Sequence, residues 1–307
     1  MYYGQMVLRL FNSCYGSYNI AIIGFNQAIA VIAYAFFGLL MTKILDSRIL
    51  ITGAASGFGH LMALMMSQKG GELVLWDIDE MGLNSVKKEI ESKGGKVTTM
   101  ICNLRNREEI NECASKTLES GSIDILVNNA GIVSGGSFLD LTPEQITATF
   151  EVNTLAHFWT VQAFLPAMLK QNKGHIVTIA SSAGLVGTSK LVDYCSSKFA
   201  AVGFDESLRA ELRGMKSKVR TSVICPFVAN TGMFEGVKRR FYLLPVLKPE
   251  KVVRKIIKVI EKNRRRLLIP KFVYASYICR LFPVWLNDWI GDTLGVNKTM
   301  EGFTGRN

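Results

Sequence analysis

Short apolar segments alternate with longer amphipathic segments through most of this 307-residue chain. Apolar runs bounded by turn residues are typical of buried strands, and segments such as 80–93 and 107–119 have the length and periodicity of helices. Strands that alternate with helices form a parallel sheet covered on both faces. We therefore predict an α/β fold with a doubly wound parallel sheet of about seven strands. The predicted strands are residues 49–52, 72–76, 97–101, 123–127, 175–179, 219–224 and 267–269.

A glycine cluster lies in the first turn from a strand to a helix. The turn reads TGAASGFG and contains Gly53, Gly57 and Gly59. Glycines at this place let the backbone approach a pyrophosphate, which then lies at the positive end of the following helix. Glycine triplets also occur in tight turns that bind nothing, but the position between an apolar run and an apolar helix favours a dinucleotide. The turn therefore predicts a Rossmann-like nucleotide site.

An acidic residue follows the second predicted strand. Asp77 lies 18 residues after Gly59, in the segment LVLWDID. A carboxylate at this place accepts hydrogen bonds from the hydroxyls of the adenosine ribose and repels a 2′-phosphate. Neither Ser56 nor Ile78 is a basic residue that could bind such a phosphate. We therefore predict NAD as the cofactor, with NADP less favoured.

A phenol and an ammonium lie four residues apart in the segment DYCSSKFAAVGF. Side chains at positions i and i+4 share one face of a helix, so Tyr194 and Lys198 can act together. A phenol with a pKa of about 10 is a poor base at neutral pH, and a nearby cation favours its ionised form. Isolated pairs with this spacing arise freely by chance, so the meaning of this pair depends on the rest of the chain.

Four motifs occur in a fixed order. TGAASGFG is followed by NNAG at residues 128–131, SSAG at 181–184 and YCSSK at 194–198. With these motifs, the region from about residue 47 to residue 270 resembles the short-chain dehydrogenase/reductase family. The resemblance implies an oxidoreductase that transfers hydride to or from a nicotinamide cofactor.

The resemblance also implies roles for individual residues. Tyr194 would be the general acid/base, and Lys198 would bind the nicotinamide ribose and lower the pKa of the phenol. Ser181, which lies 13 residues before Tyr194, is favoured over Ser182 as the group that bonds the substrate oxygen. Asn153 would help to hold a water molecule in a proton relay.

Two sets of functional residues follow from this resemblance. The catalytic set is Ser181, Tyr194, Lys198 and Asn153, of which Ser181 and Tyr194 also bind the substrate. The cofactor-binding set is Gly53, Ser56, Gly57, Phe58, Gly59, Asp77, Asn103, Asn129, Ala130, Gly131, Tyr194, Lys198, Pro226 and Thr231.

The chain departs from the family pattern at two places. Asn103 follows the third predicted strand where the family often has Asp, and we expect a small effect because an amide can also bond the adenine. Phe227 follows Pro226 where the family has glycine, and we expect it to shape the nicotinamide end of the site. Asn128 is expected to brace the sheet.

Residues 20–41 form an apolar run of 22 residues without a charged side chain. A helix of this length is about 33 Å long, enough to cross a hydrocarbon core of about 30 Å. The run is longer than the apolar part of a typical signal peptide and begins later. A single span, a hairpin and an interfacial helix all remain open. We predict a membrane-anchoring segment over 1–46, a dinucleotide-binding catalytic domain over 47–270 and an amphipathic extension over 271–307.

Within the family, the chain most resembles the membrane-associated epidermal retinol and 17β-hydroxysteroid dehydrogenases. The resemblance rests on the apolar N-terminal run and on the segments LVLWDI, HFWTVQAFLPAML, DYCSSKFAAVGF and CPFVANTGMFEG. It implies NAD-dependent oxidation of a lipophilic alcohol, either retinol or a hydroxysteroid. It also implies a place on the endoplasmic reticulum membrane or on lipid droplets, with the catalytic domain in the cytosol. An NADPH-dependent carbonyl reductase and a non-catalytic membrane or lipid-droplet scaffold stay as alternatives.

Composition narrows the choice of partners. The net charge of +11 is not accompanied by a nucleic-acid motif, so we expect no nucleic-acid partner. We expect the positive charge to attract anionic lipid head groups instead. The three histidines lack metal-ligand spacing, and no metal is expected. Residues 271–307 are rich in aromatic side chains and are expected to lie on a membrane or to line the substrate entrance, with packing in a homodimer or in the core as the alternative.

Overall fold

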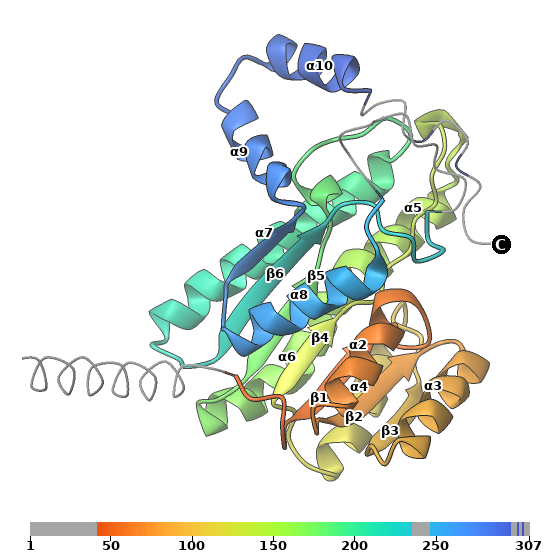
Figure 1. The fold of residues 1–307 in the computed structure, drawn as a ribbon, viewed down its shortest axis with the longest axis vertical. Helices are drawn as coiled ribbons and strands as arrows, with labels where there is room; N and C mark the ends of the chain where they lie inside the picture. The colour runs from red at the N-terminus through yellow and green to blue at the C-terminus, as the bar shows by residue number, and fades with distance from the viewer. Residues whose placement is uncertain (1–41, 235–245, 296–299, 301–302, 304–307) are drawn as a thin grey trace, which may run out of the picture. The chain divides into compact units, whose positions relative to one another are not determined.

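A seven-stranded parallel sheet forms the centre of the protein, as the sequence predicts (Figure 1). The computed structural model describes residues 42–234, 246–295, 300 and 303. The strands are β1 (Arg48–Thr52), β2 (Glu72–Asp77), β3 (Val97–Ile101), β4 (Ile125–Asn128), β5 (His175–Ile179), β6 (Arg220–Pro226) and β7 (Arg266–Ile269). They lie in the order β3-β2-β1-β4-β5-β6-β7, and every neighbouring pair is parallel. This is the Rossmann-like order, which changes direction between β1 and β4 and opens a crevice there for a ligand.

Helices cover both faces of this sheet. The longer helices are α2 (Gly57–Ser67), α3 (Glu80–Ser92), α4 (Arg107–Glu119), α5 (Pro143–Phe150), α6 (Ala156–Gln171), α7 (Val192–Gly214), α8 (Pro249–Glu261) and α10 (Val284–Thr293). Shorter elements are the π-helix η2 (Glu151–Leu155), the short helix α9 (Ala275–Cys279) and the 3-10 turns η1 (Phe138–Asp140), η3 (Ser182–Gly184) and η4 (Lys271–Tyr274). The side chains of α2, α3 and α8 form one core with the sheet, and those of α4, α6 and α7 contribute to a second core on the other face.

Alternation along each strand divides the apolar residues between the two cores. Ile49 and Ile51 face α2 and α8, whereas Leu50 between them faces α4 and α6. Successive strand residues point to opposite faces, and burial on both sides explains why the strands read as continuous apolar runs. The largest fully buried pair, Trp76 and Phe164, packs with ring centroids 5.7 Å apart. These cores fix the carboxyl ends of the strands, where the site lies.

Residues just before β1 pack on the same body as the sheet. The backbone N–H of Thr42 donates to the carbonyl of Glu261 at 3.0 Å, and Ile44 is buried. Residues 42–307 form one compact unit. The apolar run at 20–41 lies outside the described residues. Among the helices that the structure does describe, none is long and apolar enough to cross a bilayer.

Candidate active site

One large cavity lies at the carboxyl ends of the strands. Its volume is about 1240 Å³, and its wall comes from the segments that follow six strands, from α7 and from the C-terminal segment. All predicted cofactor-binding residues except Gly59 line it, as do Ser181, Tyr194 and Lys198. Asn153 of the predicted catalytic set does not line it. The fold therefore gathers into one cavity residues that are more than 170 positions apart in the sequence.

The glycine turn after β1 is held tightly against the segment after β4. Gly53 has a φ of +64°, and a Cβ there would lie 2.7 Å from the Cα of Ala130. The Asn129 side chain donates from Nδ2 to the carbonyls of Thr52 and Gly53, at 2.9 and 3.0 Å. Only glycine fits at Gly53, because a side chain would be strained and would clash with backbone. The Asn129 side chain thus fixes the shape of the turn, and Asn129 also lines the cavity.

Gly59 acts in packing and not in the cavity wall. A Cβ at Gly59 would lie 2.0 Å from the carbonyl oxygen of Gly53. The third glycine of such a turn allows the helix to pack closely on the strand before it. The structure therefore places Gly59, which the sequence analysis included in the cofactor-binding set, against the turn and not in the cavity wall.

The carboxylate of Asp77 organises the adenosine end of the cavity. Its Oδ2 accepts from the backbone N–H of Ala55 at 2.9 Å, and its Oδ1 accepts from that of Asp79 at 3.1 Å. Asn103 lines the same end, and its Oδ1 accepts from the backbone N–H of Arg105 at 3.1 Å. Arg105 also lines the cavity and pairs with Glu151, with 2.7 Å between Nε and Oε2. Sequence reasoning placed Asn103 of this segment at the site but missed Arg105, because no motif includes that side chain.

These residues fit a nicotinamide dinucleotide. The turn has left-handed glycines at Gly53 and Gly57, α2 begins at Gly57, and a Cβ at Gly57 would point toward Thr231 at 3.5 Å. Backbone at this turn and the positive end of α2 could hold the pyrophosphate, and Asp77 could hold the adenosine ribose. Lys198 lies at the other end of the cavity, where it could hold the second ribose.

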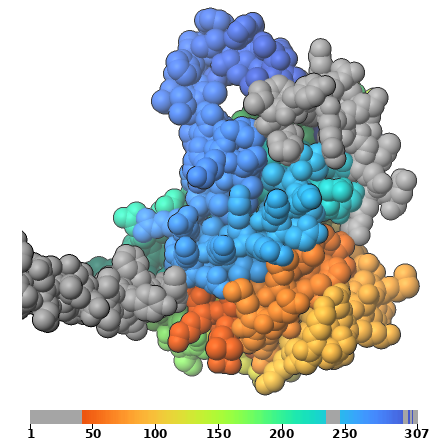
Figure 2. All heavy atoms as spheres, viewed as in Figure 1, coloured from red at the N-terminus to blue at the C-terminus, as the bar shows by residue number. Residues whose placement is uncertain are grey.

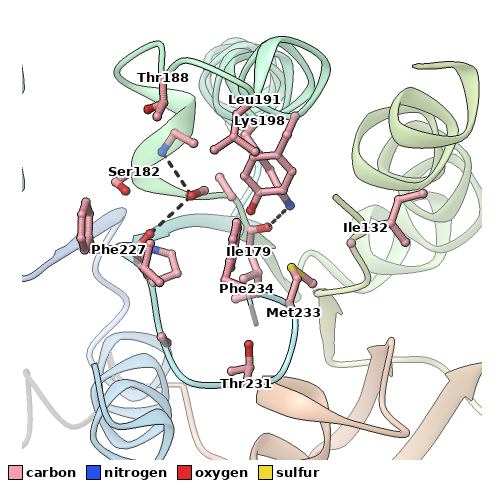
Figure 3. A pocket seen from close by; sticks show the side chains of 18 of the residues that line it. Ile132, Ile179, Ser182, Thr188, Leu191, Lys198, Phe227, Thr231, Met233 and Phe234 are labelled. Atoms are coloured by element: carbon pink, nitrogen blue, oxygen red, sulfur yellow. Dashed lines mark hydrogen bonds between the residues drawn. The ribbon is translucent and has the colours of Figure 1, made fainter. Parts of the chain in front are cut away.

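Tyr194, Lys198 and Ser181 meet at that other end. Tyr194 and Lys198 lie one turn apart on α7 and are 4% and 3% exposed. Lys198 Nζ lies 5.8 Å from the centre of the Tyr194 ring and donates to the carbonyl of Ile179 at 3.1 Å (Figure 3). Ser181 Oγ donates to the carbonyl of Pro226 at 3.5 Å and accepts from the backbone N–H of Ala183 at 3.1 Å. Ser181 and Tyr194 thus line the same end of the cavity.

Burial governs the protonation of this group. It raises the pKa of Tyr194 above its ordinary value, while the hydrogen bond with Ser181 lowers it. Burial lowers the pKa of Lys198 to about 8. The sequence analysis expected the cation of Lys198 to lower the pKa of the phenol, and the loss of hydration of the buried phenolate acts in the opposite direction as the largest effect on that pKa.

Asn153 lies behind the cavity wall, in the π-helix η2. Its Oδ1 accepts from the backbone N–H of Ile132 at 2.8 Å, and its Nδ2 donates to the carbonyl of Ile132 and to Ser197 Oγ, at 2.9 and 3.0 Å. A Cβ at Gly131 would lie 3.2 Å from Asn153 Oδ1 and 3.3 Å from Lys198 Nζ, so both groups flank the same glycine. π-Helical turns are rare in proteins, and those that do occur are often found at functional sites. Asn153 ties the segment after β4 to α7.

Comparison with known proteins agrees with this geometry. Residues 47–240 match the family of short chain dehydrogenases. The chain belongs to the short-chain dehydrogenase family. This short-chain dehydrogenase is therefore an alcohol oxidoreductase that uses a nicotinamide cofactor.

Curated relatives and solved structures carry more specific names. The dehydrogenase is 43% identical to mouse epidermal retinol dehydrogenase 2 over 84% of this chain and 85% of the relative. It is 43% identical to human estradiol 17-beta-dehydrogenase 11 over 76% of this chain and 79% of the relative. A short chain dehydrogenase/reductase from Burkholderia phymatum in complex with NAD is 28% identical, with a TM-score of 0.72 over 78% of this chain and 95% of the other. A metagenomic short-chain oxidoreductase in complex with NADP is 26% identical, with a TM-score of 0.63 over 74% of this chain and 97% of the other.

Proposed function

We propose that this protein oxidises a lipophilic alcohol with NAD. The observation that carries the proposal is the placement of Ser181, Tyr194 and Lys198 at one end of a cavity whose wall also carries apolar side chains. Leu191, Met233 and Phe234 are part of this wall (Figure 3). An alcohol whose body is apolar would bury that body among these side chains and present its hydroxyl to Ser181 and Tyr194. The names of the relatives support retinol and a 17β-hydroxysteroid as the two candidate substrates.

The proton chemistry follows from the residues of the chain. The bound dinucleotide supplies the acceptor for the hydride. Ser181 orients the substrate oxygen, and Tyr194 takes the hydroxyl proton as the general base. Lys198 stabilises the phenolate, because its ammonium lies beside the ring on the same helix face. Asn153 keeps α7 and the segment after β4 in register, through its bonds to Ser197 and Ile132.

The preference for NAD depends on the charge of Asp77. A carboxylate held by the N–H groups of Ala55 and Asp79 would lie where a 2′-phosphate has to fit. Asp77→Asn keeps an acceptor for the Ala55 N–H and removes the charge. We expect the ratio of kcat/KM with NADP to kcat/KM with NAD to rise about tenfold. The measurement is NAD(P)H absorbance, with retinol and a 17β-hydroxysteroid supplied to the full chain in detergent.

Asp79→Asn is the matched control, because it removes a neighbouring charge whose side chain caps α3. This variant should keep the cofactor preference of the natural protein. An unchanged ratio in Asp77→Asn would contradict the assignment of Asp77. A natural protein that works better with NADP would favour the carbonyl reductase, and one that oxidises no lipid alcohol with either cofactor would favour the scaffold.

We further propose that a lipid surface delivers the substrate, with α9 and α10 as the contact. Both helices project from the sheet-and-helix body (Figures 1 and 2). Leu281, Val284, Trp285 and Trp289 are strongly exposed, whereas Ile290 and Leu294 of the same segment line the cavity. Tryptophan favours the membrane interface, where its ring is apolar and its N–H remains hydrated. One side of the segment would therefore touch lipid while the other borders the cavity.

Quenching by brominated lipids tests this contact. The full chain in vesicles whose acyl chains carry bromine should lose tryptophan fluorescence, and Trp285→Phe/Trp289→Phe should lose most of that quenching. Trp76, which is buried, and Trp159 remain in the variant as internal references. Equal quenching in both proteins would contradict the proposal, and so would a fluorescence change that depends on protein concentration and not on lipid, which would indicate a homodimer.

A further inference from the structure

The C-terminal tail reaches back to the catalytic tyrosine. Met300 is 4% exposed and belongs to one packed cluster with Leu191, Tyr194 and Cys195. Met300 also lines the cavity. Phe303 packs against the same cluster, and its backbone N–H donates to the carbonyl of Met300 at 3.2 Å. Both side chains therefore pack against the cluster that contains Tyr194.

Because Gly135 has no side chain, the ring of Phe303 can pack directly on the backbone there. A Cβ at Gly135 would lie 2.3 Å from Cε1 and 2.5 Å from Cδ1 of the Phe303 ring. Gly135 has a φ of +66°, and Gly136 donates from its backbone N–H to the carbonyl of Lys190 at 3.0 Å. The ring thus rests on bare backbone next to the start of α7. Such a close approach is available only at glycine.

Aromatic contacts join the tail to the wall of the cavity. The ring of Phe234 meets the ring of Tyr194 edge to face, with 5.6 Å between centroids, and lies 6.3 Å from the ring of Phe303. Figure 3 shows Phe234, Leu191 and Lys198 around the same space. These contacts are apolar, so they can discriminate between substrates by shape but not by hydrogen bonding.

We propose that Met300 forms a roof over Tyr194 that sets the width of the alcohol accepted by the site, and that Phe303, outside the cavity lining and packed on Gly135, supports this roof. The inference rests on the proposed oxidation of a lipophilic alcohol and adds the residues that choose among such alcohols. A slender polyene such as retinol slides beneath the roof, whereas the fused rings of a hydroxysteroid have to displace it. Met300 is therefore a specificity-determining residue, and Phe303 is a positioning residue.

Kinetics with two substrates test the roof. Met300→Ala and Phe303→Ala should each lower the ratio of kcat/KM for all-trans-retinol to kcat/KM for a 17β-hydroxysteroid by about tenfold, because a truncated side chain makes room for the wider substrate. Met300→Leu and Phe303→Leu keep apolar volume and should restore most of the ratio. Met215→Ala, at a side chain that is 54% exposed at the end of α7, is the control and should leave the ratio unchanged.

A second measurement needs neither cofactor nor substrate. Cys195 is buried within the roof cluster, whereas Cys225 is buried in a different cluster. In both alanine variants, N-ethylmaleimide should alkylate Cys195 at least about tenfold faster than in the natural protein, as measured by mass spectrometry of the peptides. Cys225 should react at an unchanged rate, which would exclude general unfolding.

The two measurements separate the two proposals. Unchanged substrate ratios together with an unchanged rate at Cys195 would overturn the roof. Faster alkylation of Cys225 as well as Cys195 would also overturn it, because the tail would then be a general stabiliser of the fold. If the natural protein oxidises neither alcohol but Cys195 becomes accessible in the variants, the proposed function fails and the covering of Tyr194 stands.

Discussion

Replacement of Tyr194 by phenylalanine is expected to lower kcat for alcohol oxidation about 10³-fold, because the variant has no group to take the hydroxyl proton. The ring keeps its contact with Phe234 and its place in the cluster with Leu191. Affinity for NAD should stay within about threefold, because the glycine turn and Asp77 are untouched. Steady-state kinetics and titration with NAD measure the two effects separately.

Tyr274→Phe is the matched control. This phenol is exposed in η4, outside the lining of the cavity, and its loss should change neither kcat nor the affinity for NAD. If Tyr194→Phe keeps more than about a tenth of the natural kcat, the assignment of Tyr194 as the general base is wrong.

Lys198→Met is expected to have the second largest effect. At pH 7 the ammonium is mostly charged, because its pKa of about 8 lies above this pH. Its removal leaves the phenolate of Tyr194 without a cation and the carbonyl of Ile179 without its donor. We expect kcat/KM to fall about 10² to 10³-fold at pH 7, a loss comparable to that of a general acid/base group.

The effect of Lys198→Met on kcat/KM should depend on pH in a direction set by the charge of Lys198. Below pH 8 Lys198 of the natural protein carries its charge, and above pH 8 it loses it. The ratio of natural to variant kcat/KM should therefore be largest below pH 8 and should narrow as the pH rises through that value. Kinetics from pH 6 to pH 10 measure the ratio. Lys170→Met, at an exposed position of α6, should give a ratio near one throughout, and a constant ratio for Lys198→Met would show that its charge is not what matters.

The strands could be predicted from the sequence because their burial leaves a local signal. The third predicted strand and the helix at 107–119 have the observed bounds of β3 and α4. The prediction for β4 begins two residues early, since Ile123 is buried although it precedes the ladder, and Asp124 instead accepts from the backbone N–H of Arg48. Apolar periodicity reports burial, and burial extends beyond the hydrogen-bonded strand.

The candidate site divides into a part with local signals and a part without them. Tyr194 and Lys198 share a helix face, and their spacing alone brings them together. Met300 lies more than 100 residues after Tyr194, in a segment whose composition indicates only apolar character. No pattern in one sequence reports such a contact. The raised pKa of Tyr194 was also beyond sequence reasoning, because the loss of hydration depends on tertiary packing.

The brace that Asn129 forms on the glycine turn has a consequence for the evolution of this enzyme. Its hydrogen bonds to Thr52 and Gly53 hold the glycine turn in one conformation. Little of the backbone in this turn would therefore have to become ordered when the coenzyme binds. The end of the cavity that we propose for the alcohol includes Met300, which shares no hydrogen bond with that turn among the described contacts. Mutations in the tail can therefore change the choice of alcohol while the machinery that holds the coenzyme is inherited intact.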